Sequence, residues 1–167
     1  MKQLITALLL SSLIMTAQAQ SHFNVLVYHH VSESSPASTS VSPEQFREHL
    51  SFFQDNNYPV VALDEALDTL EAGNELPKNA IAITFDDAYR SIYLNAFPLL
   101  KEFKVPFTVF AATDPIDQNF NDMLSWDQLR EMKAWGATIA NHTKDHSYLV
   151  RHRSLDALWQ QETKANI

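Results

Sequence analysis

Two pairs of polar residues, each placed just after an apolar run, carry side chains that could hold a divalent metal ion. Asp86 and Asp87 follow the run Ala80–Phe85. His142 and His146 follow a second apolar run and stand four residues apart. Imidazoles at i and i+4 lie on one face of a helical turn and can both reach one cation. Two histidines and one aspartate would leave coordination positions open for water and substrate.

Each pair also has an ordinary structural interpretation. An Asp pair after a strand can cap the N-terminus of a helix and interact with its dipole. Because the chain has seven histidines, a pair at this spacing can arise by chance. The position of the pairs favours a metal site, since both follow predicted strand ends. A bound cation would also relieve the repulsion between two adjacent carboxylates and keep both ionised.

The segments that must position these residues alternate between strand and helix patterns. Apolar runs predict strands over residues 23–29, 58–63, 80–85, 106–112 and 137–141, and most are continuous, as in strands buried on both faces. Helices are predicted over residues 42–56, 63–73, 91–103 and 125–136. Pro98 is expected to kink the third of these helices. The alternation predicts an α/β fold with helices packed outside a parallel sheet, either a barrel or an open sheet.

The position of a site in such a fold follows from the sheet. Active sites of parallel α/β folds lie at the carboxyl ends of the strands, which is where both polar pairs are expected. Neighbouring side chains in a strand point to opposite faces. Asp86 and Asp87 can therefore serve one site only if the chain leaves strand geometry at this point.

Composition excludes several classes of function. The absence of cysteine excludes disulfides, thiolate nucleophiles and cysteine zinc sites. Two glycines are too few for a glycine-rich phosphate loop or a Gly-x-Ser-x-Gly elbow. A net charge of −8 at pH 7 disfavours nucleic acid as a partner.

The first residues have the pattern of a secretory leader. Residues 1–19 contain one lysine, an apolar run and the sequence Ala-Gln-Ala, which together predict a removed signal peptide. No later stretch approaches the roughly 20 apolar residues that span a bilayer. We therefore expect an exported protein without a membrane span, located in the periplasm, the cell envelope or the extracellular space.

Several segments around these residues match the motifs of one enzyme family. They include TFDDAYRS at residues 84–91 and NHTKDHSYL at residues 141–149, with MLSWDQLREMKAWG leading into the second. The chain thereby resembles the polysaccharide deacetylases, the family-4 carbohydrate esterases with a NodB-homology domain. The segments VLVYHHVS and VSPEQFREHLSFFQDNNYPVVAL also resemble the exported subgroup related to poly-N-acetylglucosamine deacetylases. The resemblance implies a distorted (β/α) barrel around a parallel sheet, with residues 20–167 as the N-terminal portion of the catalytic domain.

When the family's motifs are matched to this chain position by position, the resemblance also implies a role for each polar residue. Asp87, His142 and His146 match the residues that bind a divalent metal, zinc, and Asp86 matches the catalytic base. The implied reaction removes acetyl groups from an N-acetylated polysaccharide, an N-acetylglucosamine polymer. In that reaction the metal lowers the pKa of a water molecule and polarises the acetyl carbonyl, while Asp86 takes the proton of the water.

The chain departs from the family pattern in several places. Ala88 stands where many members have glycine, and Asn141 where many have serine. The later family motifs are an Arg/Pro segment, an Asp-Trp segment and a Leu-x-His that supplies the general acid, and they have no counterpart after His146. The chain stops within an amphipathic helical pattern at residues 154–167. We therefore expect the first part of a truncated domain, with the metal half of the site and without the acid half.

Alternative interpretations remain open at this stage. His29 and His30 end the first predicted strand on the same rim, where they could line the substrate groove or simply form a polar strand end. The chain could be a non-catalytic carbohydrate-binding protein or an inactive deacetylase fragment. Two histidines and one carboxylate also suit a non-haem iron enzyme.

Overall fold

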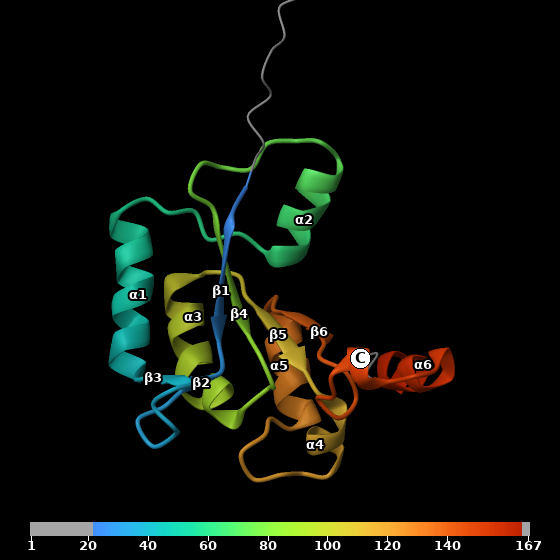
Figure 1. The fold of residues 1–167 in the computed structure, drawn as a ribbon. Helices are drawn as coiled ribbons and strands as arrows, with labels where there is room; N and C mark the ends of the chain where they lie inside the picture. The colour runs from blue at the N-terminus through green and yellow to red at the C-terminus, as the bar shows by residue number, and fades with distance from the viewer. Residues whose placement is uncertain (1–21, 165–167) are drawn as a thin grey trace, which may run out of the picture.

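The computed structural model describes residues 22–164, which form a parallel sheet flanked by helices (Figure 1). The main sheet contains, in spatial order, β1 (Asn24–Tyr28), β4 (Ile81–Phe85), β5 (Thr108–Ala111) and β6 (Thr138–Asn141). Each neighbouring pair of strands is parallel, and the spatial order follows the chain order. Each crossover therefore advances in the same direction, as in the wall of a barrel. The predicted parallel α/β fold is confirmed, whereas the predicted signal peptide, residues 1–19, lies outside the described residues.

Helices occupy the connections between these strands. Their bounds are α1 (Pro43–Asp55), α2 (Leu63–Glu71), the π-helix η1 (Ile92–Ala96), α3 (Phe97–Phe103), α4 (Thr113–Asp117), α5 (Trp126–Trp135), the 3₁₀-helix η2 (Leu149–Arg151) and α6 (Leu155–Lys164). A small parallel ladder joins β2 (His30–Val31) to β3 (Ser40–Val41) after the first strand. Figure 1 shows α1 beside α3, and α6 projecting away from the other elements. No helix in residues 22–164 has the length and apolar character needed to cross a bilayer.

The core is densest around β4, which is buried along its whole length. Phe85 at the end of β4 lies against Phe46 of α1 and Phe107 before β5, with ring centroids 5.8 and 6.0 Å apart. Val25 and Val27 on the edge strand β1 are exposed. The expectation of strands buried on both faces therefore holds for β4 and is wrong for β1, because within residues 22–164 nothing covers the face that carries Val25 and Val27.

Two further predictions need correction. Residues 58–63 were predicted as a strand, but they form a single bridge between Val60 and Ile81. Pro59 cannot donate a backbone hydrogen bond, and α2 begins at Leu63, so the segment is too short for a ladder. The helix predicted over 91–103 contains a π-helical turn before Pro98 rather than a simple kink. The N–H of Phe97 reaches the carbonyl of Ile92 there, five residues back.

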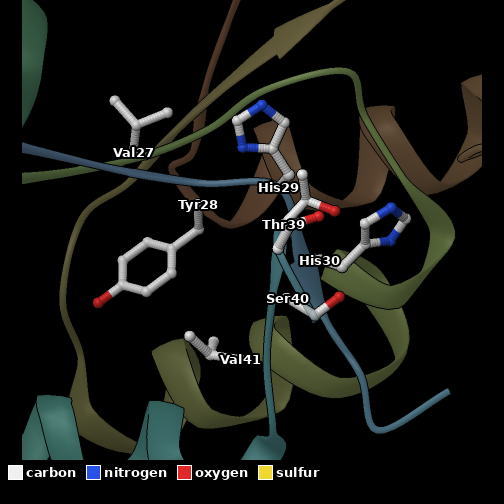
Figure 2. A pocket seen from close by; sticks show the side chains of 8 residues that line it. Val27, Tyr28, His29, His30, Thr39, Ser40 and Val41 are labelled. Carbon is white, nitrogen blue, oxygen red and sulfur yellow. The ribbon is translucent and has the colours of Figure 1, made fainter. Parts of the chain in front are cut away.

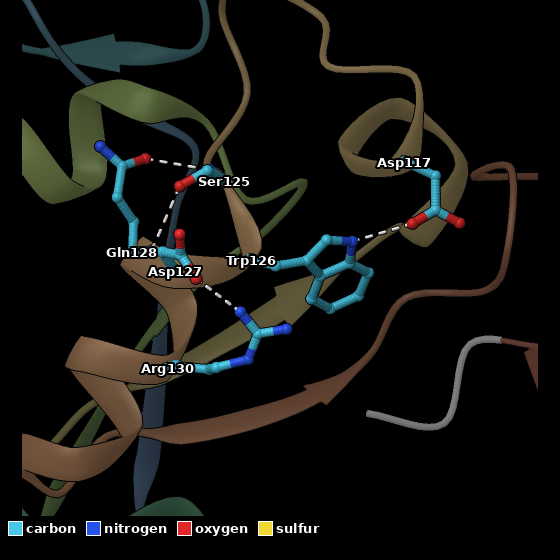
Figure 3. Close-up of polar contacts among 6 residues, drawn as sticks. All are labelled: Asp117, Ser125, Trp126, Asp127, Gln128 and Arg130. Atoms are coloured by element: carbon cyan, nitrogen blue, oxygen red, sulfur yellow. Dashed lines mark hydrogen bonds and ion pairs between the residues drawn. The ribbon is translucent and has the colours of Figure 1, made fainter.

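The capping of α5 fixes the start of the helix that leads into β6. The Ser125 hydroxyl accepts the backbone N–H of Gln128, and the Gln128 side chain accepts the N–H of Ser125 (Figure 3). The Trp126 indole N–H donates to Asp117 Oδ1 at 2.8 Å, which ties the start of α5 to the end of α4. Gly136 ends the helix with φ +122°, a conformation that side-chain-bearing residues rarely adopt. The chain then enters β6, which delivers the histidine pair.

Candidate metal centre

The aspartate pair lies at the carboxyl end of β4, where the chain leaves strand geometry. The N–H of Asp86 donates to the carbonyl of Tyr28 at 2.9 Å, so Asp86 still extends the ladder with β1. Asp87 and Ala88 then adopt left-handed φ values of 69° and 61°. Such residues cost of order 1–3 kcal/mol each and persist only where the surroundings impose them. The condition under which two adjacent carboxylates can serve one site is therefore met.

The histidine pair lies in a loop directly after β6, not on a helical turn as the spacing predicted. The N–H of His142 donates to the carbonyl of Ala111 at 3.1 Å, which places His142 beside the end of β5. Thr143 and His146 have left-handed φ values of 64° and 59°. The N–H of Thr143 donates to Asn141 Oδ1. These local bonds and turns, rather than helical periodicity, bring the two imidazoles together.

The two loops meet, so Asp87 contacts both histidines. Asp87 Oδ1 lies 3.3 Å from His142 Nε2 and 3.2 Å from His146 Nε2. The two imidazole rings have centroids 4.7 Å apart. The side chains of Asp87, His142 and His146 are 13%, 26% and 58% exposed, so the site opens to solvent on the His146 side. The three residues predicted from the sequence as metal ligands are thus brought together.

This geometry fits a small divalent cation. One ligand atom from each of the three residues lies within 4.8 Å of the other two. Tetrahedral zinc with ligand bonds of about 2.0–2.2 Å has ligand atoms roughly 3.3–3.5 Å apart, close to the two Asp87 distances. Asp87 Oδ1 is buried, and no hydrogen bond from residues 22–164 satisfies it. The two imidazole nitrogens near it are not in hydrogen-bonding geometry. A buried carboxylate oxygen in that situation is costly, and a cation between the three side chains would compensate it.

Electrostatics within the cluster favour an ionised carboxylate. Burial alone would raise the pKa of Asp87, but the His142 and His146 imidazoles outweigh it and hold the pKa below its ordinary value. Asp87 in turn raises the pKa of His142 against the opposing effect of burial, and the Asp86 charge acts in the same direction. The second carboxylate is therefore close enough to influence the same site.

A pocket of about 380 Å³ opens beside Asp87 and His146. Its polar lining includes Tyr89, Asn121 and Asp122, and its apolar lining consists of Ala112, Pro115, Phe120 and Met123. Backbone bonds from Arg90 to Asp122 (2.7 Å) and from Leu124 to Ala88 (2.9 Å) hold the 120–124 segment against the loop after β4. This wall of the pocket, residues 120–124, was not predicted from the sequence. The sequence offers one indication of it, the aromatic residue Phe120 within the polar run Asp-Gln-Asn-Phe-Asn-Asp. The Phe120 side chain is 53% exposed.

His29 and His30 lie on the rim where they were expected. Both line a pocket of about 320 Å³ with residues 38–41, and Figure 2 shows their rings on the side opposite the Tyr28 ring. The His30 ring stacks on Tyr89 with centroids 3.7 Å apart. A third pocket, lined by His30, Tyr89 and Asp122 among others, adjoins both. The three pockets share lining residues and run from the Asp87 cluster to β3.

Comparisons with known proteins place these motifs in one family. The family model described as polysaccharide deacetylase matches residues 73–167, which include the Asp86–Asp87 pair and the histidine loop. The chain belongs to the polysaccharide deacetylase family. The poly-β-1,6-N-acetyl-D-glucosamine N-deacetylase of Staphylococcus aureus strain MRSA252 is 33% identical over 133 residues, which cover 77% of this chain and 46% of that protein.

Solved structures of deacetylases share the fold. The Streptococcus pyogenes deacetylase PplD, in complex with acetate, superposes with a TM-score of 0.78 at 26% identity, over 86% of this chain and 65% of that one. IcaB from Ammonifex degensii gives a TM-score of 0.69 at 31% identity, over 84% of this chain and 58% of that one. The chain thus spans less than half of its curated deacetylase relative and less than two thirds of these two structures.

Proposed function

We propose that this chain carries the metal-binding part of a deacetylase that hydrolyses N-acetyl groups of an N-acetylglucosamine polymer. The observation that carries the proposal is the Asp87–His142–His146 cluster at the carboxyl ends of two strands of the parallel sheet, β4 and β6, with Asp86 next to it. Membership of the polysaccharide deacetylase family and the likeness to a poly-β-1,6-N-acetyl-D-glucosamine N-deacetylase support the reaction and the substrate class.

The residues would divide the chemistry between them. Asp87, His142 and His146 would hold a divalent metal, and the two imidazoles with one carboxylate favour zinc. Bound there, zinc would lower the pKa of a water molecule and polarise the acetyl carbonyl. Asp86 would accept a proton from that water as its oxygen attacks the carbonyl carbon. The carbon–nitrogen bond then breaks, the amine takes up a proton, and acetate and a glucosamine unit result.

The pocket beside the cluster suits an acetylated sugar. Its apolar side, with Pro115, Phe120 and Met123, can receive the acetyl methyl group or the apolar face of a pyranose ring. Its polar side, with Tyr89 and Asp122, can bind sugar hydroxyls. The adjoining pockets along the rim would take neighbouring sugar units, and His29 and His30 would line this groove.

Export of the protein is part of the proposal, because a polysaccharide of the cell envelope lies outside the cytoplasm. Residues 1–19 carry the leader pattern. Mass spectrometry of the exported protein should find an N-terminus at Gln20. An exported protein that retains residues 1–19 would contradict the proposed leader.

The test of the reaction measures acetate release from a β-1,6-linked N-acetylglucosamine oligomer. The chain, and any longer polypeptide encoded by the same reading frame, would be assayed with zinc and with a chelator. We expect zinc-dependent acetate release that Asp86→Asn strongly reduces while zinc binding persists. Binding of the oligomer without acetate release in either polypeptide would favour a carbohydrate-binding protein, and oxygen consumption with iron would favour a non-haem iron enzyme.

A further inference from the structure

The histidine loop is held by a polar clamp outside the metal cluster. Lys144 lies between the two histidines, and its backbone N–H donates to Gln161 Oε1 at 3.2 Å. The Gln161 amide in turn donates to Asp145 Oδ2 at 3.2 Å. One side chain from α6 thus binds two consecutive residues of the segment that separates His142 from His146.

The same loop is held from its other side by α4. The N–H of Asp114 donates to the carbonyl of Lys144 at 2.7 Å, and Lys144 Nζ donates to Asp114 Oδ2 at 2.7 Å. Lys144 is therefore fixed through its N–H, its carbonyl and its ammonium group. These contacts lie within two residues of both histidines, and the loop they hold contains two left-handed residues, Thr143 and His146.

Burial distinguishes Gln161 from residues 155–160 of the same helix. Gln161 is 8% exposed, whereas Leu155 and Trp159 of the same helix are 83% and 65% exposed. A buried amide whose oxygen and nitrogen both bond to one loop leaves buried polar groups unsatisfied when those partners are lost, which costs free energy. The contact of α6 with the histidine loop is therefore polar, in a helix where Leu155 and Trp159 face solvent.

We propose that Gln161 is a positioning residue for the metal centre, which it serves by fixing the Lys144–Asp145 backbone so that His142 and His146 point at Asp87 together. The inference rests on the proposed metal-binding role of the three side chains. Residues that orient metal ligands without touching the metal typically change metal affinity by about 10–100-fold when they are replaced. We therefore expect a loss of zinc affinity of about tenfold or more in Gln161→Ala.

The experiment compares two substitutions of neighbouring glutamines in the full chain. Gln161→Ala removes both hydrogen bonds, and Gln160→Ala makes the same chemical change at the adjacent, exposed position of α6. Gln161→Glu keeps an acceptor for the Lys144 N–H, loses the donor to Asp145 and places a second carboxylate against Asp145, so it should weaken zinc binding as well. If circular dichroism shows that Gln161→Ala does not fold, the comparison of Gln161→Glu with the wild type tests the proposal instead.

Zinc affinity would be measured by competition with a chromophoric chelator, and the ligand geometry from the visible spectrum of the cobalt-substituted protein. We expect weaker zinc binding and an altered cobalt spectrum in the Gln161 variants, with Gln160→Ala equal to the wild type. Equal zinc affinity and identical cobalt spectra in wild type, Gln161→Ala and Gln161→Glu would overturn the proposal. A wild type that binds no zinc would overturn the metal centre itself. Zinc binding without acetate release, in both this chain and the longer polypeptide, would leave the clamp standing and refute the proposed reaction.

Discussion

Replacing Asp87 by asparagine should weaken zinc binding about 100-fold while leaving the metal-free fold intact. Asparagine has nearly the same shape and is among the residues that best tolerate left-handed φ, so the backbone at φ 69° should be kept. The change removes the only carboxylate of the three-ligand set. Since a structural zinc ion binds with roughly 10 kcal/mol or more, one of three protein ligands accounts for about 3 kcal/mol, or roughly a 100-fold change in affinity.

The magnitude can be expressed as a shift in melting temperature. Zinc at about 100 times its dissociation constant stabilises the folded chain by about 2.7 kcal/mol. For a domain of this size, each kcal/mol raises the melting temperature by roughly 2–4 °C, which gives a shift of about 5–11 °C in the wild type. After a 100-fold loss of affinity, the same zinc concentration contributes only about 0.4 kcal/mol, or about 1–2 °C.

The assay is thermal unfolding followed by circular dichroism, with zinc and with a chelator. Asp55→Asn, at an exposed position in α1, makes the same chemical change far from the cluster in sequence and should keep the full zinc-dependent shift. If Asp87→Asn keeps a shift as large as that of the wild type, Asp87 is not a zinc ligand and the assignment of the cluster fails.

Three further predictions test the catalytic base, the helix cap and the buried rim. Asp86→Asn should keep the zinc-dependent shift and lower acetate release by about 10²–10⁴-fold, and loss of zinc binding would instead make Asp86 a ligand. Ser125→Ala removes the capping box of α5 and should cost about 1 kcal/mol, or about 2–4 °C in melting temperature; an unchanged value would refute the role of the cap. Burial raises the pKa of Tyr28 to about 12, so the folded protein holds this proton more tightly than the unfolded chain, whose tyrosine pKa is about 10. The stabilisation is complete below pH 10 and is lost as the pH rises towards 12, so chemical denaturation should show a decline in that range that Tyr28→Phe removes; an equal decline in both proteins would contradict it.

Much of the fold and the site could be predicted because local patterns and long-range structure agree. The continuous apolar run of β4 indicates that the strand is buried, and the capping residues Ser42 and Ser125 indicate where α1 and α5 begin. Both polar pairs follow strands of a parallel sheet, so the expectation that they meet at one edge needed only the parallel arrangement. The contacts of Asp87 with His142 and His146 follow from that arrangement.

Other features depend on contacts that no local pattern encodes. The histidine loop is shaped by left-handed residues such as Thr143 and by bonds to α4 and α6, so the i, i+4 spacing predicted a helical turn that is not formed. The segment 120–124, which includes Phe120, is held against the loop after β4 by backbone hydrogen bonds between two segments without regular secondary structure. The role of Gln161 could not be predicted from the sequence, because it depends on a contact between α6 and Lys144, which lies 17 residues earlier in the chain.

The most direct test of the central claim, that Asp87, His142 and His146 together hold one divalent cation, is crystallographic. Diffraction data from zinc-loaded crystals, collected on both sides of the zinc absorption edge, would locate the metal without reference to the expected ligands. We expect an anomalous peak about 2.0–2.2 Å from one Asp87 carboxylate oxygen and from Nε2 of both histidines. A peak at other side chains, or no peak at this cluster in a zinc-containing crystal, would contradict it.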